Sequence, residues 1–152
     1  MIPAVHAQHF PAMTDEAIAK ARRIEAEMLM FPQLPLHTAH LFHAGTYART
    51  IRIPAGAALA GALIKRATML ILSGHATVFI GDETIELCGY HVIPASAGRK
   101  QVFLAHADTE LTMIFPTSAT TVEQAENEFT DEADGLISRQ HAHLDSVTIT
   151  GE

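Results

Sequence analysis

Ten histidines give this chain of 152 residues its most versatile side chains, because a neutral imidazole binds transition metals and transfers protons near neutral pH. His37, His40 and His43 are spaced by three residues, which would align them on a helix. A proline upstream and an alternating segment downstream favour extended structure instead, so that His40 points away from the other two. His141 and His143 would share one face of a strand, but no third ligand is evident nearby.

The other histidines show no ligand spacing either. His75 and His106 lie beside expected turns, and His91 alternates with its neighbours in an expected strand. A surface position or a structural hydrogen bond is the favoured role for each. A metal site assembled from several of them stays open, although their spacing does not support it. The sequence also contains no nucleophile elbow, no glycine-rich phosphate loop and no arrangement of Ser, His and Asp that would indicate nucleophilic catalysis.

One amphipathic helix is predicted over residues 14–28. Thr14 is a suitable N-cap, two acids occupy the first turn where the helix dipole favours them, and no Gly or Pro interrupts the segment. Apolar side chains recur at helical spacing, so one face should pack on a sheet or a partner. These side chains are Ala17, Ala21, Ile24 and Met28. Residues 1–13 have no periodicity and should be ordered only where they dock on something.

From residue 37 onward the pattern changes to short strands with a period of two. Tyr47 and Arg49 fall on the same face of the first clear strand. A Gly-Asp turn at Gly81 is expected to join the strands over residues 77–80 and 84–87 in a hairpin. Short strands at regular spacing, separated by Gly and Pro, favour a sandwich or barrel. The expected strands cover residues 47–53, 70–72, 77–80, 84–87, 102–105 and 111–115.

A second helix is predicted over residues 120–138, with Ala125 and Phe129 on its apolar side. Its many acids read as a solvated face. The tail after residue 140 has a weakly strand-like segment. We therefore expect one globular domain with three parts, which are an arm and helix in residues 1–36, a barrel in residues 37–118, and a helix and tail in residues 119–152.

Composition narrows the class of protein. Hydrophobic residues make up 48% of the chain and charged residues 18%, which suits one sizeable core. The net charge of −7 argues against nonspecific binding to nucleic acid, because neutralising phosphates requires clustered Lys and Arg. A lone Cys88 excludes an internal disulfide and is expected to be buried in a strand. Without a signal peptide or an apolar stretch of about 18 residues, we expect a soluble intracellular protein with no membrane partner.

Residues 40–117 resemble the cupin superfamily. The resemblance lies in the segment from His40 to Arg49, the Ile-Pro-Ala corner before Gly56, the run from Gly61 to Gly74, the loop from Pro94 to Lys100, and Asp108-Thr109 before the last strand. The details are most similar to small cupin-like proteins of bacteriophages and prophages. This resemblance implies a mainly β, RmlC-like jelly-roll barrel, commonly a homodimer, in the cytoplasm of a bacterial host. It implies no single activity, since the fold carries many.

In a typical cupin this frame holds a metal through two His, one Glu and a later His. The corresponding positions are here Ala62, Ile64, Ala67 or Thr68, and Arg99 or Gln101. Among the positions of the two His and the Glu, only Thr68 retains even a weak oxygen donor. We therefore expect no metal and no cofactor in the barrel, and the apolar Ala62 and Ile64 favour a filled interior.

The resemblance also implies that cationic and polar side chains gather at the barrel mouth, where they would favour a carboxylate, a phosphate or a sugar acid. The candidate ligand-binding residues are Tyr47, Arg49, Lys65, Arg66, Thr68, Lys100, Gln101 and His106. The alternative is that these cations are exposed loop residues paired with nearby acids, and that Arg49 pairs with a buried acid.

Two functions remain open from the sequence. The favoured one is a non-enzymatic binding or assembly protein of phage type, in which a homo-oligomeric jelly roll acts as a scaffold and no residue is catalytic. The other is an enzyme or sensor for a small anionic or sugar-like molecule that uses the cationic pocket without a metal.

Overall fold

The computed structural model describes residues 8–151 and begins with an arm that docks on the barrel. Phe10 is fully buried and forms a parallel bridge with Ala95. The arm leads into helix α1 (Asp15–Met28), whose N-cap Thr14 accepts a hydrogen bond from the backbone N–H of Ala17, as predicted. The part of the predicted arm in residues 1–7 lies outside the described residues.

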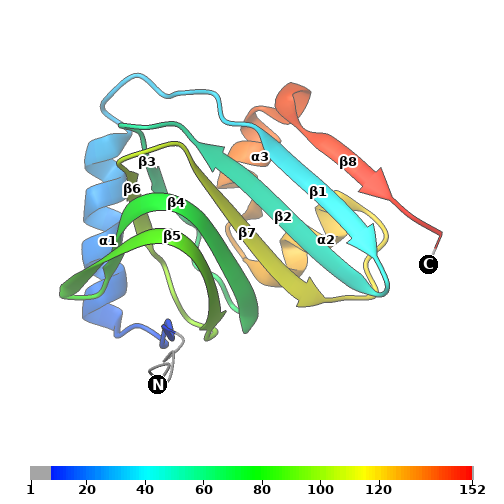
Figure 1. Cartoon of the computed structure of the whole chain (residues 1–152), viewed down its shortest axis with the longest axis horizontal. Coiled ribbons are helices and arrows are strands. Elements are labelled where there is room, and N and C mark those ends of the chain that lie inside the picture. Colours follow the sequence, from blue (N-terminus) through cyan, green and yellow to red (C-terminus); the bar gives the residue numbers. More distant parts are fainter. Residues whose placement is uncertain (1–7, 152) are drawn as a thin grey trace.

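A single curled sheet forms the body of the protein (Figure 1). Its neighbouring strands run in the order β3-β6-β4-β7-β2-β1-β8, and β5 pairs with β4 outside that path. The strands are β1 (Thr38–His43), β2 (Thr46–Ile53), β3 (Ala58–Ala60), β4 (Thr68–Ile80), β5 (Glu83–Ala95), β6 (Val102–Ala105), β7 (Thr109–Pro116) and β8 (Ser146–Ile149). The predicted mainly β jelly-roll fold with a helix towards each end is confirmed, and its strands form one curled sheet.

Strands β4 and β5 form one long hairpin around the predicted Gly81-Asp82 turn, with Ile80 opposite Glu83. The sequence suggested that Gly74 separates two short strands, but β4 continues through it. Gly74 lies opposite Gly89 in the register, with φ angles of 146° and 92° that disfavour residues bearing a Cβ. The two glycines therefore let a paired ribbon bend without losing its hydrogen bonds.

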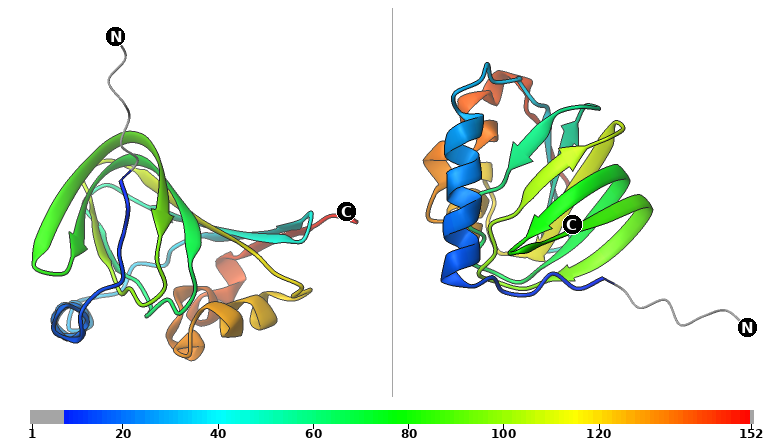
Figure 2. Two further views of the ribbon diagram at one scale, coloured as in Figure 1. Left: turned by 90° about the horizontal axis from the view of Figure 1, so that it is seen from below. Right: turned by 90° about the vertical axis from the view of Figure 1, so that its left-hand side faces the viewer.

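Helices α1 and α2 (Val122–Phe129) lie on the open side of the curled sheet (Figure 2). Alternate residues of β2 and β4 point to this concave side, which carries the hydrophobic core. Ala17 and Ala21 bury the inner face of α1, as the helical spacing predicted. The concave face of the sheet and the helices over it thus enclose the interior of the barrel.

The C-terminal segment differs from the predicted single helix over residues 120–138. Helix α2 ends at Phe129, because Thr130 adopts an extended backbone with φ −152° and its hydroxyl donates to the carbonyl of Leu63. Two short turns, η1 (Ala133–Gly135) and η2 (Ala142–Leu144), flank a one-turn helix α3 (Ile137–Gln140). The weakly strand-like tail becomes β8, which joins the sheet in parallel with β1.

Cys88 was expected to be buried but is exposed on β5, because its position alternates outward from the concave face. Among the described residues, no helix is long and apolar enough to cross a membrane.

Candidate functional site

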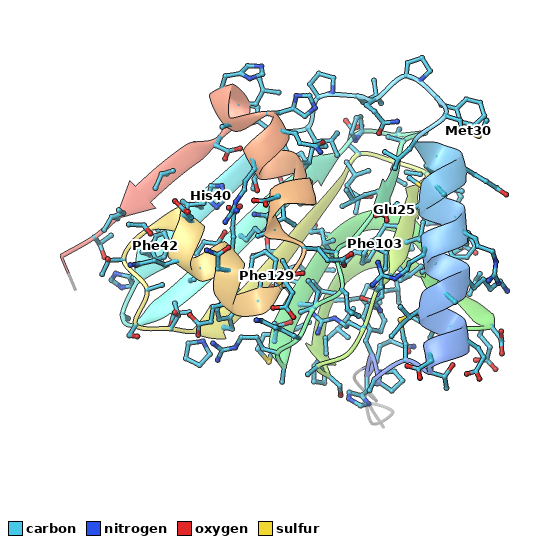
Figure 3. All side chains as sticks on the ribbon, turned by 180° about the vertical axis from the view of Figure 1, so that it is seen from behind. Glu25, Met30, His40, Phe42, Phe103 and Phe129 are labelled. Carbon is cyan, nitrogen blue, oxygen red and sulfur yellow. The ribbon has the colours of Figure 1, made fainter. Side chains whose placement is uncertain are left out.

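A cavity of about 660 Å³ opens within the barrel, which the sequence led us to expect to be filled. It lies between the sheet, the end of α1 and the segment after α2, where Glu25, Phe103 and Phe129 are found (Figure 3). Most of its lining is apolar and comes from the end of α1 and the segment after it, from β3 and its flanking residues, and from the segment after α2, with a few residues of β2, β4, β6 and β7. Its size is that of a site for a small organic molecule.

Arg99 contributes a buried positive charge to this cavity. The residue is only 2% exposed, and its guanidinium donates to the carbonyl of Ser96 and the hydroxyl of Thr68, both at 2.7 Å. Among residues 8–151 no carboxylate pairs with it. Burial lowers the pKa of Arg99 to about 10, which leaves the guanidinium charged at neutral pH. Among the described residues, Arg99 is therefore a cation held in place only by uncharged acceptors, which are oxygens and the sulfur of Met113.

Gln101 adds an unsatisfied hydrogen-bond donor on the same wall. The residue lines the cavity and is 5% exposed, and its buried Nε2 has no hydrogen-bond partner among the described residues. A buried amide without a partner costs about 1–3 kcal/mol. A ligand oxygen in the cavity would remove that cost.

Lys100 connects the cavity wall to helix α1. Its ammonium donates to the carbonyl of Gly61 at 2.8 Å and to Glu25 at 3.1 Å, and Glu132 lies 3.9 Å away. Burial opposes ionisation of Glu132, but hydrogen bonds from Arg22 and the backbone of Leu63, with the charge of Lys100, keep its pKa below the usual value. The charge of Lys100 is therefore already matched by two acids.

The interior does not fit the metal of a typical cupin. Ala62 and Ile64, at the positions of the two family histidines, line the cavity with apolar groups. Thr68 is buried and accepts its hydrogen bond from Arg99. A guanidinium beside the remaining donor position would repel a metal ion, so the chain's own residues here suit an anion.

Arg49 reaches the cavity from β2 as part of a buried ion network. Its guanidinium donates at 3.0 Å to Glu126 and to the hydroxyl of Ser138, and it lies over the ring of Phe129. Glu126, which is 1% exposed, also accepts a hydrogen bond from Arg139 at 2.9 Å. This agrees with the alternative that Arg49 pairs with a buried acid.

Tyr47 lies on the same face of β2 as Arg49, as predicted, but it does not line the cavity. Its hydroxyl is 2.6 Å from Nδ1 of His40, and Nε2 of His40 is 3.1 Å from Asp145 just before β8. Burial raises the pKa of Tyr47 to about 12. The predicted orientation of His40, opposite to His37 and His43, is confirmed, and its role is to tie the C-terminal segment to the sheet.

A pH-dependent stability is expected from His40. Burial, together with the charge of Arg49, lowers its pKa below 6.5, so the folded chain keeps this imidazole neutral while the unfolded chain protonates it. Stability is therefore lost as pH falls from 6.5 towards the lowered pKa, by at most about 1.4 kcal/mol per pH unit. Urea unfolding of the wild type and of His40→Gln across this pH range should show that the variant loses less stability as the pH falls. Parallel pH profiles would contradict this role.

Besides Tyr47, three more of the predicted ligand-binding residues lie away from the cavity. Lys65 pairs with Asp131, and Arg66 pairs with Glu128 over the ring of Phe115. His106 lies on the outer face of the barrel. The cavity thus brings together Arg49, Lys100 and Gln101 from the predicted set. Arg99 also lines it, and Thr68 contacts Arg99 without lining the cavity.

No protein-family model matches the sequence, and no curated protein matches it. Among solved structures it is similar to a cupin superfamily protein from Desulfitobacterium hafniense, at 13% identity and a TM-score of 0.44, over 59% of this chain and 86% of that one. It is also similar to the Schizosaccharomyces pombe Cnp3 cupin domain, at 21% identity and a TM-score of 0.44, over 67% of this chain and 73% of that domain. These structural neighbours of the chain are cupin superfamily proteins.

A third cupin neighbour is a salicylate 1,2-dioxygenase from Pseudaminobacter salicylatoxidans, with 15% identity and a TM-score of 0.47. It matches 76% of this chain, which spans only 35% of the dioxygenase. At these identities the likeness to cupins concerns the fold alone, and no ligand or activity carries over. The likeness to phage and prophage proteins stays a prediction.

Proposed function

We propose that this protein binds a small organic anion, with a carboxylate or similar group and an apolar body, inside the barrel cavity. The observation that carries this proposal is the guanidinium of Arg99, which is buried at the cavity wall with no carboxylate partner among the described residues. Arg forms strong, paired hydrogen bonds with carboxylates and phosphates. A ligand anion would supply the countercharge that the chain does not.

The rest of the cavity selects for the remainder of the ligand. Its walls beyond Arg99 and Gln101 are mostly apolar, so a hydrocarbon or aromatic body would bury its surface there. Leu29, Phe31 and Leu34 are exposed at the rim, after the end of α1. Such a rim favours an amphipathic molecule over a strongly hydrated sugar acid.

Binding is a better account of this cavity than catalysis. Its carboxylates Glu25 and Glu132 are held by Lys100 and Arg22, which leaves neither free to move a proton. Arg49 is likewise paired with Glu126. The groups that remain for a ligand, Arg99 and Gln101, are hydrogen-bond donors and not proton-transfer groups at neutral pH.

The proposal can be tested with 1-naphthoate and its uncharged analogue 1-naphthamide. Isothermal titration calorimetry should show that the wild type binds naphthoate at least about tenfold more tightly, since a hydrogen bond to a charged group contributes about 1.5–3 kcal/mol. This preference should disappear in Arg99→Gln and shrink in Gln101→Leu. Gln101→Leu keeps the protein testable if the loss of Arg99 prevents folding, because it removes an unsatisfied group.

Lys65→Gln is the matched control, because it removes one positive charge from a partly exposed pair outside the cavity. It should bind naphthoate as the wild type does. Equal affinity for naphthoate and naphthamide in the wild type, or an equal loss in the Lys65 variant, would overturn the proposal. Thermal unfolding of each variant separates a lost ligand contact from a lost fold.

A phage-type assembly role is the second candidate. It is supported by apolar side chains on the outer face of the β4–β5 hairpin, where Met69, Tyr90 and Val92 are exposed. Among residues 8–151, β5 pairs with β4 and meets the arm only near Ala95. If naphthoate does not bind, assembly through this edge becomes the better account. The expected homodimer stays a prediction, since binding in the cavity requires no second subunit.

A further inference from the structure

Two histidines and a glutamate meet on the outer face of the barrel, remote from the cavity lining. His75 lies on β4, Glu86 on β5, and His106 in the turn between β6 and β7. One ligand atom from each residue lies within 4.8 Å of the other two. The rings of His75 and His106 have centroids 4.8 Å apart, and Nε2 of His75 is 2.5 Å from a carboxylate oxygen of Glu86.

The backbone fixes these three residues relative to one another. The N–H of His106 donates to the carbonyl of His75 at 2.8 Å, which ties the β6–β7 turn to β4. The N–H of His75 in turn donates to the hydroxyl of Thr109 at 3.1 Å. Glu86 lies opposite Thr77 in the β4–β5 register, two residues from His75 on the same outer face. The cluster is therefore built on paired strands and does not depend on a loose loop.

The ring of His106 is held by a neighbouring hydroxyl. Thr77 lies 2.6 Å from Nε2 of His106, which orients that ring. A tetrahedral Zn²⁺ site has ligand bonds of about 2.0–2.2 Å, so its donor atoms lie about 3.3 Å apart. The exposed Glu86 side chain can open its short contact with His75 to that spacing by a rotamer change.

We propose that His75, Glu86 and His106 bind one divalent transition-metal ion, with Zn²⁺ the best match to two imidazoles and a carboxylate. The site differs from the cupin centre, whose positions face the interior through Ala62 and Ile64. Three protein ligands leave the fourth position of Zn²⁺ to water or to a group on another molecule. The spacing of the histidines along the chain does not indicate this site, because His106 follows His75 by 31 positions.

Titration of the untagged protein with Zn²⁺, followed by calorimetry at pH 7.5, tests the proposal. We expect one equivalent to bind, and the affinity to fall at least tenfold in each of His75→Ala, His106→Ala and Glu86→Gln. Titration with Co²⁺ should give the intense visible absorption of a four-coordinate ion, which the three variants lose. Binding should also weaken at pH 5.5, where imidazoles are protonated.

Other histidines provide matched controls. His91→Ala removes a histidine on β5 that is hydrogen-bonded to the carbonyl of Cys88. His141→Ala combined with His143→Ala removes the two neighbouring rings of the C-terminal segment. Both controls should retain the wild-type stoichiometry and affinity. Undiminished binding in His75→Ala, or no saturable binding by the wild type, would overturn the proposal, and thermal unfolding without metal verifies that every variant is folded.

Discussion

Replacing Glu126 with glutamine is expected to lower the free energy of unfolding by about 3–5 kcal/mol. Glu126 is 1% exposed and accepts hydrogen bonds from Arg49 and Arg139. Arg139 is partly exposed and also pairs with Asp134, but Arg49 is buried and would retain no countercharge. Urea unfolding at pH 7.5, followed by circular dichroism, measures the change.

Glu123→Gln is the control, since Glu123 occupies the exposed first turn of the same helix. It should cost below about 1 kcal/mol, the usual contribution of an acid near a helix N-terminus. Removing both charges in Arg49→Met with Glu126→Leu should recover much of the loss, because an apolar pair avoids leaving one charge unmatched. Equal stabilities for the Glu126 and Glu123 variants would contradict a network that depends on a buried countercharge.

Gly74→Ala should destabilise the barrel by about 3–5 kcal/mol, through overpacking and backbone strain together. A Cβ at this position would lie 2.7 Å from the Cα of Thr109 and 2.8 Å from the carbonyl oxygen of Asp108. These are backbone atoms, which cannot move away by a rotamer change as a side chain can. The φ angle of 146° adds a strain that glycine avoids.

Gly89→Ala separates the two contributions. Gly89 has a φ of 92°, but a Cβ there would meet nothing within 4 Å. Its substitution should therefore cost only the conformational part, about 1–2 kcal/mol. Thermal and urea unfolding of both variants measure the difference. A Gly74 variant as stable as the Gly89 variant would show that the contact between β4 and the start of β7 can relax.

Features that depend on neighbouring residues were predictable from the sequence. The cap at Thr14, the uninterrupted helix after it and the Gly-Asp hairpin each depend on a few consecutive residues, and the structure has all three. The alternation that places Tyr47 and Arg49 on one face is local in the same way. Local preferences of this kind survive because the tertiary contacts agree with them.

Features decided by contacts distant in the chain were not predictable. The helix expected over residues 120–138 ends early because Thr130 bonds to Leu63, 67 residues away. Lys65 and Lys100 are both cations, yet one meets Asp131 outside the barrel and the other is buried against Glu25 and Gly61. Nothing in the neighbouring sequence indicates which acid a lysine will find. The meeting of His75 and His106 follows from strand pairing alone.

The position of β8 has a consequence for how the chain folds during synthesis. Strand β1 is synthesised early, but its outer edge pairs with residues 146–149. His40 can contact its partner Asp145 only after another 105 residues have been made. At about 5–20 residues per second, the ribosome leaves that edge uncovered for several seconds or longer. An open strand edge presents unpaired backbone N–H and C=O groups that can pair with another chain, so the nascent chain is open to misassociation until β8 is made. The last strand thus completes a sheet that the first strand begins.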